Sequence, residues 1–277
     1  MKYLKAVRYD PGCEKAPFFQ RLLEELKKNE VQVLPFKSGG TVQEGSLLIL
    51  RASEKQEMPA QIPGSHPYVC WDPDGSSKGL KESWIRKAQC IIEGFDEVDA
   101  DFLEKMFQRG RGIPWTIAET ERLILREFSV EDHCHIFPEI STEPDFTSKY
   151  IENMYGIFGY GIWAVVLKET GQIIGRAGVY DCSALDGFEL GYAIESPFRQ
   201  KGYAHEACAA ALDFAENRLG LKEIYALIEP ANQESIKVAL SLGFRQIMGK
   251  TVKDERTSGE LLVFFRSVFV DNAEKSV

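Results

Sequence analysis

The alternation of apolar and polar positions divides the first part of the chain into short strands and an amphipathic helix. Apolar runs at residues 3–9, 31–36, 46–52 and 90–95 have the length and side-chain types of short buried strands. Residues 17–29, PFFQRLLEELKKN, instead repeat apolar side chains at helical spacing. This pattern predicts a small α/β domain.

A second helix and a glycine-rich break follow. Residues 99–107 place apolar side chains on one helical face, which we expect to dock this domain on the next. The sequence RGRGIP at residues 109–114 then interrupts the pattern with two glycines and a proline. We therefore predict one domain at residues 1–112 and another at 113–277. Residues 59–79, rich in Pro, Gly, Ser and Asp, predict a long loop inside the first.

The second domain opens with a strand and two helical stretches. Residues 121–126 alternate like a strand, and the S-V-E-D sequence from Ser129 to Asp132 is typical of a helix start. A further helix is predicted at residues 146–158. Apolar residues 162–167 and 173–180 flank the turn sequence ETGQ, which predicts an antiparallel hairpin.

Residues 188–194 form the next predicted strand, and a basic loop follows it. Phe188, Leu190, Tyr192 and Ile194 share one face, so Glu189 lies on the other. The sequence FRQKGYAHEA then leads into an alanine-rich helix. A helix N-terminus offers unpaired backbone N–H groups and the positive end of its dipole, so this junction predicts an anion site suited to pyrophosphate.

Composition and charge limit the classes of partner that we expect the protein to bind. The chain of 277 residues is 44% hydrophobic, enough for two ordinary cores. Its formal net charge of −9 argues against a nucleic-acid surface, which needs clustered Lys and Arg. No apolar run reaches the roughly 20 residues of a membrane helix. Six scattered cysteines without a C-x-x-C pair indicate free thiols in a reducing cytoplasm.

The basic loop carries a resemblance to a known family. Its order, Arg199-Gln200-Lys201-Gly202-Tyr203-Ala204, resembles the acetyl-coenzyme A pyrophosphate loop of the GNAT acyltransferases. The flanking sequences ETERLILREFSVEDH and NQESIKVALSLGF are similar to the family's opening and to its later helix. The match covers roughly residues 115–270, and within the superfamily it looks most like the ribosomal-protein N-acetyltransferases.

The resemblance implies an α/β (α+β) GNAT fold, with a mixed sheet that splays beside its central strand. Backbone groups of Tyr192, Ala193 and Ile194 would then bind the pantetheine arm of acetyl-coenzyme A. A backbone N–H near Ala193 or Ile194 would stabilise the oxyanion that forms as an amine attacks. Asn232 would cap the later helix and also contact the cofactor. No metal is implied.

Two proton transfers remain to be assigned. Glu189 is the candidate base, although a salt bridge with Arg176 on a neighbouring strand is equally compatible with its position. Many relatives place a tyrosine acid where this chain has Ala239. That departure leaves Ser235, a bound water or no acid at all, and Ser235 can instead help to cap its helix.

The leading hypothesis is an acetyl-coenzyme A dependent N-acetyltransferase that acts on a primary amine, either a protein N-terminus or a small molecule. The alternative is a module that binds acyl-coenzyme A without turnover, and Ala239 keeps it open. For the first domain, covering the cleft, binding a partner and forming a homodimer all remain compatible with the sequence.

Two further motifs are given little weight. Asp72 and Asp74 imitate the D-x-D-G of aspartate-nucleophile phosphatases, but too little chain follows before the boundary, which favours a turn. His133 and His135 imitate a metal pair, but residues two apart on a helix point in different directions.

Overall fold

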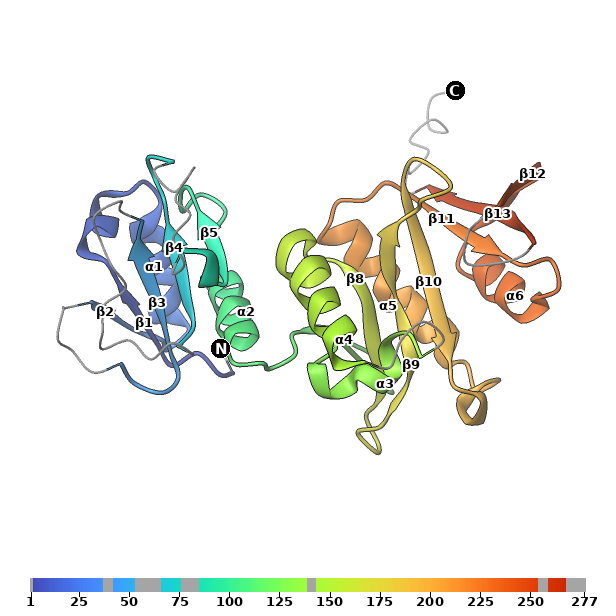
Figure 1. Cartoon of the computed structure of the whole chain (residues 1–277), viewed down its shortest axis with the longest axis horizontal. Coiled ribbons are helices and arrows are strands. Elements are labelled where there is room, and N and C mark those ends of the chain that lie inside the picture. Colours follow the sequence, from blue (N-terminus) through green and yellow to red (C-terminus); the bar gives the residue numbers. More distant parts are fainter. Residues whose placement is uncertain are drawn as a thin grey trace, which may run out of the picture. The chain divides into compact units, whose positions relative to one another are not determined.

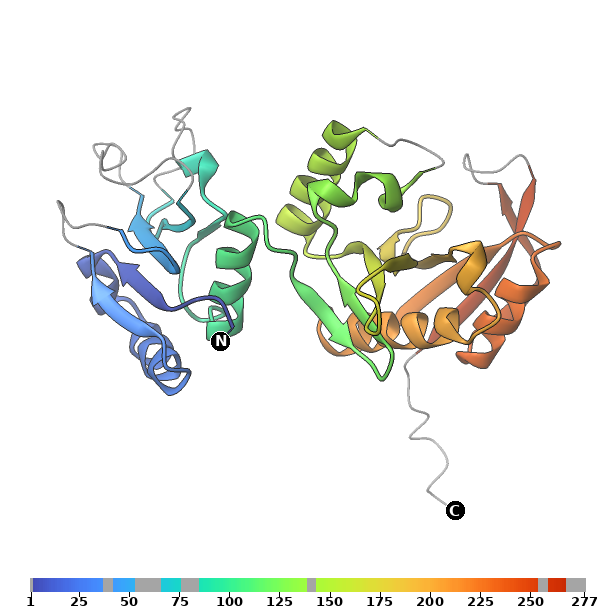
Figure 2. The ribbon, with the colours of Figure 1, turned by 90° about the horizontal axis from the view of Figure 1, so that it is seen from below.

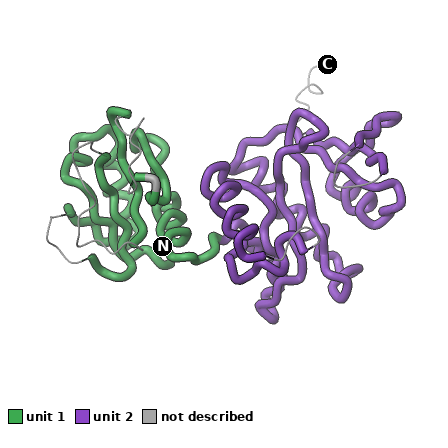
Figure 3. Tube along the Cα trace, in the orientation of Figure 1, with its two compact units in different colours: residues 1–115 green, residues 116–277 purple. Residues whose placement is uncertain are grey.

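The computed structural model describes residues 2–36, 42–52, 66–75, 85–138, 143–253 and 259–267. The chain divides into two compact units, residues 1–115 and 116–277, close to the boundary expected from the sequence (Figure 3). Each unit buries its own hydrophobic core. Within the described ranges, no helix is both long and apolar enough to cross a bilayer.

Unit 1 is built on a five-stranded sheet with strand order β2-β1-β3-β4-β5, in which every neighbouring pair is parallel (Figure 1). Its strands are β1 (Ala6–Tyr9), β2 (Gln32–Pro35), β3 (Ser46–Arg51), β4 (Tyr68–Trp71) and β5 (Cys90–Ile92). Its helices are η1 (Pro11–Lys15), α1 (Phe19–Lys28), η2 (Ile85–Lys87) and α2 (Ala100–Gly110). After β1 the chain forms β2, the edge strand. It then forms β3, which pairs with the opposite edge of β1.

Both faces of this sheet are covered, which explains why residues 47–50 of β3 and 68–71 of β4 are apolar at successive positions. Leu47 and Ile49 of β3 share a core with α1 and α2. Leu48 and Leu50 of the same strand pack in a second cluster on the opposite face. The four predicted strands and both predicted helices of this unit are confirmed.

Two expectations for unit 1 need correction. The apolar face of α2, including Leu103, Met106 and Phe107, belongs to the core of unit 1 itself rather than being reserved for docking. Residues 68–71, inside the expected loop, are the interior strand β4, while residues 59–65 and 76–79 of that loop lie outside the described residues. Asp72–Gly75 does form a turn, in which the Gly75 N–H donates to the Asp72 carbonyl at 3.4 Å.

Unit 2 contains an eight-stranded mixed sheet with strand order β12-β13-β11-β10-β9-β8-β7-β6. Its strands are β6 (Thr116–Glu119), β7 (Leu123–Arg126), β8 (Gly161–Leu167), β9 (Ile173–Asp181), β10 (Phe188–Ile194), β11 (Glu223–Ile228), β12 (Arg245–Lys253) and β13 (Glu260–Ser267). β10 and β11 are parallel, and the other neighbouring pairs are antiparallel. The predicted hairpin is confirmed as β8 and β9.

Helices cover both faces of this sheet (Figure 2). They are η3 (Val130–Asp132), α3 (His133–Ile136), α4 (Pro144–Tyr150), the π-helix η4 (Ile151–Phe158), η5 (Ser196–Phe198), α5 (Tyr203–Asn217) and α6 (Gln233–Ser241). α3 and α4 lie on one face and α5 on the other (Figure 2). Trp163 of β8 and Phe214 of α5 pack edge to face at 5.2 Å, which fixes α5 against the strands.

One predicted helix start and one predicted helix of unit 2 are present in the structure. The Ser129 N–H donates to the Asp132 carboxylate at 2.7 Å, so the expected helix start forms at η3. The helical prediction for residues 146–158 is confirmed, but its second half is a π-helix. π-helical turns are rare in proteins, and those that do occur are frequently found at functional sites.

Candidate functional site: a cleft beside β10

The sheet of unit 2 opens between β10 and β11. These two strands pair only at Phe188 with Ile224 and at Glu189 with Tyr225. On its other edge, β10 pairs with β9 along its whole length, from Phe188 to Ile194. Among the described residues, the second half of β10 therefore has one edge that pairs with no other strand, which we call its free edge. On this edge the Ile194 carbonyl accepts from Arg199 Nε at 2.8 Å.

Strand register decides which residues face this opening. The Glu195 N–H donates to Ile174 of β9 at 2.9 Å, and the Cys182 N–H donates to Gly187 at 2.9 Å. In an antiparallel ladder, backbone groups alternate between the two edges of a strand. Odd-numbered residues of β10 therefore point their N–H and C=O groups toward β9, and Tyr192 and Ile194 point theirs toward the opening.

This alternation corrects one detail of the sequence interpretation. The backbone of Ala193 is directed to β9, where it pairs with Arg176, so it is not available to a ligand in the opening. Ala193 still lines the cavity described next. Of the two expected oxyanion donors, the register favours Ile194.

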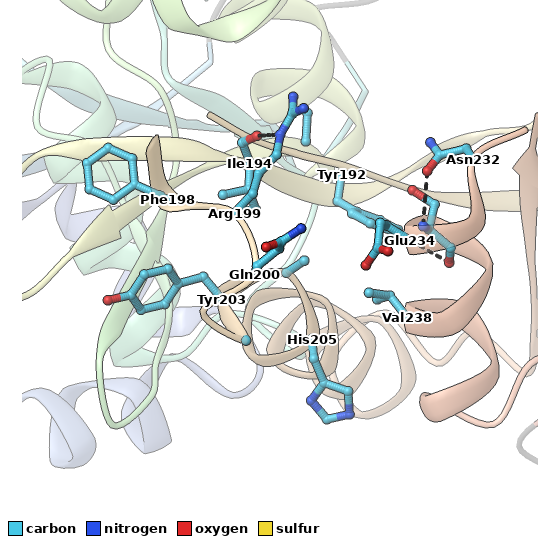
Figure 4. A pocket seen from close by; sticks show the side chains of 14 residues that line it. Tyr192, Ile194, Phe198, Arg199, Gln200, Tyr203, His205, Asn232, Glu234 and Val238 are labelled. Atoms are coloured by element: carbon cyan, nitrogen blue, oxygen red, sulfur yellow. Dashed lines mark hydrogen bonds between the residues drawn. The ribbon is translucent and has the colours of Figure 1, made fainter. Parts of the chain in front are cut away.

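A cavity of about 580 Å³ fills the opening (Figure 4). Its walls come from the end of β10, the loop that follows, the first turn of α5 and the first two turns of α6. The predicted residues among its lining are Tyr192, Ala193, Ile194, Arg199, Gln200, Gly202, Tyr203, Ala204, Asn232 and Ser235. Segments 40 residues apart in the sequence thus form one site.

The loop before α5 has the backbone of an anion cradle. Gln200 and Gly202 both take left-handed conformations, with φ of 60° and 82°. Gly202 is the N-cap of α5, and no side chain caps this end. The first-turn N–H groups of an uncapped helix attract an anion, and only glycine adopts this cap conformation without strain.

Arg199 and Lys201 differ in how they meet the cavity. Arg199 lines it, and its Nε donates to the carbonyl of Ile194 at 2.8 Å. Lys201 is exposed, its Nζ lies 5.6 Å from the ring centre of Phe198, and it is not among the lining residues. Both cations still contribute positive potential to this end of the cleft.

A partly buried carboxylate holds the loop in place. Glu206 of α5 accepts from Thr120 Oγ1 at 2.6 Å, from Arg122 N at 2.9 Å and from Arg122 Nε at 2.7 Å. Burial alone would raise the pKa of this carboxyl, but the hydrogen bonds from Thr120 and Arg122 outweigh it and hold the pKa below its usual value. Glu206 thus remains charged without opposing an anion at the helix start.

The opposite wall is built by α6. Asn232 caps this helix, since its Oδ1 accepts from the Ser235 N–H at 3.1 Å. The Ser235 carbonyl in turn accepts from the Tyr192 hydroxyl at 3.1 Å, which ties α6 to β10. Burial raises the pKa of Tyr192 to about 12, so its phenol stays protonated at neutral pH. Ser235 contributes its backbone to the cap, which leaves its hydroxyl outside that interaction.

Glu189 is the last residue of β10 that pairs with β11, so it lies where the sheet begins to open. It is only 4% exposed, and it lies opposite Tyr180 on β9 and Tyr225 on β11. Arg176, its suggested partner, lies opposite Ala193, with its guanidinium 5.5 Å from the ring centre of Phe137.

The structure shows where a tyrosine would lie at residue 239, the position at which many relatives have a tyrosine acid and this chain has alanine. Ala239 is fully buried in the core of unit 2, whereas Val238 lines the cavity. A tyrosine at residue 239 would therefore have to enter the core, and α6 offers the cavity only Asn232, Glu234, Ser235 and Val238.

The sequence did not assign a role to three lining residues, Phe198, Glu234 and Val238, while His205 was expected only to flank the cofactor and also lines the cavity. In Figure 4 the side chains of Gln200 and Glu234 extend from the loop and from α6 toward the space between them. Val238 follows Ser235 by one helical turn, so helical periodicity could have identified it. Glu234 has no such signal in the sequence.

The two histidines near η3 take separate partners. His133 Nδ1 lies 3.2 Å from the Val130 carbonyl, and His135 Nδ1 lies 3.2 Å from Glu195 Oε1. Across the described residues, no group of three or more His, Cys, Asp or Glu is arranged to hold a metal ion.

Comparison with known proteins finds similarity in the second part of the chain. Residues 113–245 match the family model described as "Acetyltransferase (GNAT) domain", so residues 1–112 lie outside the matched range. An uncharacterised N-acetyltransferase, p20 of Bacillus licheniformis, is 29% identical over 162 residues, which are 52% of this chain and 89% of that protein. The uncharacterised protein YkkB of Bacillus subtilis is 28% identical over 151 residues, which are 48% and 87%. The acetyltransferase structure from Agrobacterium tumefaciens superimposes with a TM-score of 0.43 and 25% identity, covering 54% of this chain and 92% of that one.

Proposed function

We propose that the protein transfers the acetyl group of acetyl-coenzyme A directly to a primary amine while both substrates are bound, because residues 113–245 match the family model of a GNAT acetyltransferase domain. The observation that carries this proposal is the free edge of β10. The backbone groups of Tyr192 and the N–H of Ile194 would be available to an extended pantetheine arm that adds to the strand in this cavity, while the Ile194 carbonyl already accepts from Arg199. Acetyl-coenzyme A supplies a thioester whose carbonyl carbon accepts the amine.

The loop after β10 suits the charged end of this substrate. Arg199 and the uncapped first turn of α5 would bind the pyrophosphate, with Lys201 adding charge from outside. Gly202 has no side chain to fill the cradle, and any β-carbon there would lie 3.3 Å from Arg122. Asn232, Tyr203 and Ala204 would complete the contacts with the cofactor.

Glu189 is the proposed general base. An incoming ammonium must lose a proton before its nitrogen can attack, and a carboxylate at the point where the sheet opens can accept that proton. Its burial, with only 4% of the residue exposed, places this carboxylate inside the protein and away from bulk water. The Ile194 N–H would stabilise the oxyanion formed in the attack.

Ser235 is the proposed acid. When the C–S bond breaks, the departing thiolate gains a proton, and the Ser235 hydroxyl lies on the cavity wall and is not used by the helix cap. The acceptor is a primary amine, either a protein N-terminus or a small molecule. The acidic protein favours a cationic acceptor over an anionic one.

The first test measures binding and turnover together. Gly202→Glu adds bulk and negative charge at the start of α5, so we expect acetyl-coenzyme A binding by calorimetry to fall by more than about 100-fold. Gly171→Glu is the matched control, because Gly171 also has a positive φ, of 71°, but lies in the β8–β9 turn with open space around it. Retained binding by Gly202→Glu would overturn the assignment of the loop.

The second test separates an enzyme from a binding module. Thiol release is measured with a panel of amines and N-terminal peptides, for the natural protein and for Glu189→Gln. A general base predicts a rate loss of about 100-fold or more with unchanged acetyl-coenzyme A affinity, and loss of the acidic limb of the pH–rate profile. Tight binding without amine-dependent release across the panel would favour the non-catalytic module.

A further inference from the structure

Unit 1 contains a second cavity, of about 840 Å³, at the carboxyl ends of its parallel strands. Its lining follows β1 at Pro11 and Gly12, includes the last residues of β3 and β4, Arg51 and Trp71, and continues after β5 through Asp96. β2 pairs with one edge of β1 and β3 pairs with the other edge, so the direction in which strands are added reverses at β1. Ligands of parallel α/β sheets bind at such a reversal, outside the carboxyl ends of the strands.

Arg51 is held in this cavity by two neighbours. Its Nη2 forms an ion pair with Asp74 at 2.9 Å, and its guanidinium lies 5.4 Å from the ring centre of Trp71. A β-carbon on Gly12 would lie 3.7 Å from Arg51 Nη1, so the guanidinium also approaches the loop after β1. Its side chain nevertheless remains 43% exposed. A cation and an anion are thus presented side by side to the cavity.

Trp71 supplies an aromatic wall. It is 6% exposed, lines the cavity and packs against Phe95 with ring centres 5.6 Å apart. Its indole Nε1 is buried and has no hydrogen-bond acceptor among the described residues. Buried indole N–H groups normally find a partner. Because this nitrogen is buried, Trp71 contributes an aromatic surface to the cavity.

Phe18 supplies a second aromatic surface in a strained conformation. Its φ of 62° is left-handed, which is unfavourable for a bulky side chain. The residue lines the cavity and is 54% exposed. Backbone strain of this kind tends to persist where it positions a functional group. α1 begins at the next residue, with no side-chain cap and no acidic residue in its first turn.

The lining charges define the ligand class. Lys15 and Arg51 oppose three carboxylates, Asp74, Glu93 and Asp96. A ligand with several negative charges, such as a nucleoside triphosphate, would meet an excess of carboxylates. A zwitterion satisfies both signs, and an apolar group on it can pack on the two aromatic surfaces.

We propose that this cavity binds a free α-amino acid with a large apolar side chain. Its carboxylate would pair with Arg51, and its ammonium with the adjacent Asp74. Its side chain would lie against Phe18 and Trp71. This site is separate from acetyl transfer and gives unit 1 a ligand of its own.

The test is calorimetric titration of the full-length protein with L-tryptophan, L-phenylalanine and L-leucine. Tryptamine lacks the carboxylate and indole-3-propionate lacks the ammonium, and we expect each to bind at least about tenfold more weakly than L-tryptophan. Equal binding of indole-3-propionate, or binding of ATP or inorganic phosphate in preference to the amino acids, would overturn the proposal. So would the absence of heat with all three amino acids at millimolar concentration.

Variants locate the binding. Arg51→Gln should weaken it by about tenfold or more, whereas Arg111→Gln should not, since Arg111 forms a comparable exposed pair with Glu44 at 3.4 Å outside the cavity. Phe18→Gly removes the ring while relieving the backbone, so it should weaken binding without loss of thermal stability. Binding lost with Gly202→Glu but retained with Arg51→Gln would assign the amino acid to unit 2 and refute the site.

Discussion

The guanidinium of Arg122 joins Glu206 to the cofactor loop. Its Nε donates to Glu206 Oε2 at 2.7 Å, and its Nη1 donates to the carbonyl of Lys201 at 2.9 Å. Arg122 lies just before β7, so one side chain links the start of the sheet to both the loop and the first turn of α5. The shape of the anion cradle therefore depends on a residue more than 70 positions earlier in the chain.

Arg122→Gln should weaken acetyl-coenzyme A binding although Arg122 lies outside the cofactor cavity. We expect about a tenfold loss of affinity by calorimetry, because the Lys201 carbonyl and the Glu206 carboxylate both lose the guanidinium, although Glu206 keeps its bonds from Thr120 and from the backbone N–H of residue 122. Stability should fall by about 1–2 kcal/mol.

The matched control for this prediction is Arg126→Gln. Arg126 forms a similar pair with Asp132 at 2.7 Å, away from the cavity. It should cost similar stability and leave affinity unchanged. An equal affinity loss in both variants would show a general effect of destabilisation instead of a local one.

The same carboxylate predicts a pH effect. Since the pKa of Glu206 is lowered in the folded state, its stabilising contribution is complete above its unfolded pKa of about 4.3 and is lost as the pH falls through the folded value. Urea midpoints of the natural protein and of Glu206→Gln should therefore differ most near pH 6 and converge below about pH 4. A difference that stays constant down to pH 3 would contradict the ionic role of this residue.

Two variants at α6 distinguish the helix-capping interaction from the proposed proton transfer. Asn232→Ala removes the side chain that accepts from the Ser235 N–H, so it should reduce stability by about 1 kcal/mol. Ser235→Ala keeps that N–H, so stability should change by less than about 0.5 kcal/mol while kcat falls. Chemical denaturation and steady-state kinetics measure both. An unchanged kcat in Ser235→Ala would remove Ser235 as the acid.

Restoring a tyrosine at residue 239 should not create an acid. Ala239 is fully buried, so Ala239→Tyr overpacks the core and should cost about 1–3 kcal/mol of stability. Val238→Tyr instead places a phenol on the cavity wall. A rise in kcat with Ala239→Tyr, without loss of melting temperature, would show that α6 is rotated from the arrangement described.

The sequence predicts this site well where it depends on local order. The loop from Arg199 to Ala204, the cap at Asn232 and the face of Glu189 all follow from periodicity and short motifs. The free backbone edge of Ile194 does not, because it depends on the register between β9 and β10. The Arg122 contact with Lys201 was likewise not predictable, since nothing local in the sequence relates these positions.

Unit 1 shows a similar limit. Its strands could be recognised from apolar runs, but β4 was hidden in a segment rich in Pro and Gly. The cavity there requires the strand order, which places Gly12, Arg51 and Trp71 at one edge of the sheet. Only the folded topology relates these residues to one another.

The pairing of β10 with β9 also determines which mutations the protein can tolerate during evolution. Recognition of the pantetheine arm through Tyr192 and Ile194 would use backbone groups, which substitution of side chains leaves in place. A slip of one residue between the strands would turn these groups toward β9 and carry Glu189 to the opposite face. Substitutions that keep the register are therefore free to alter acceptor preference, whereas a single-residue insertion or deletion in β9 would disrupt both the proposed cofactor contacts and the proposed base.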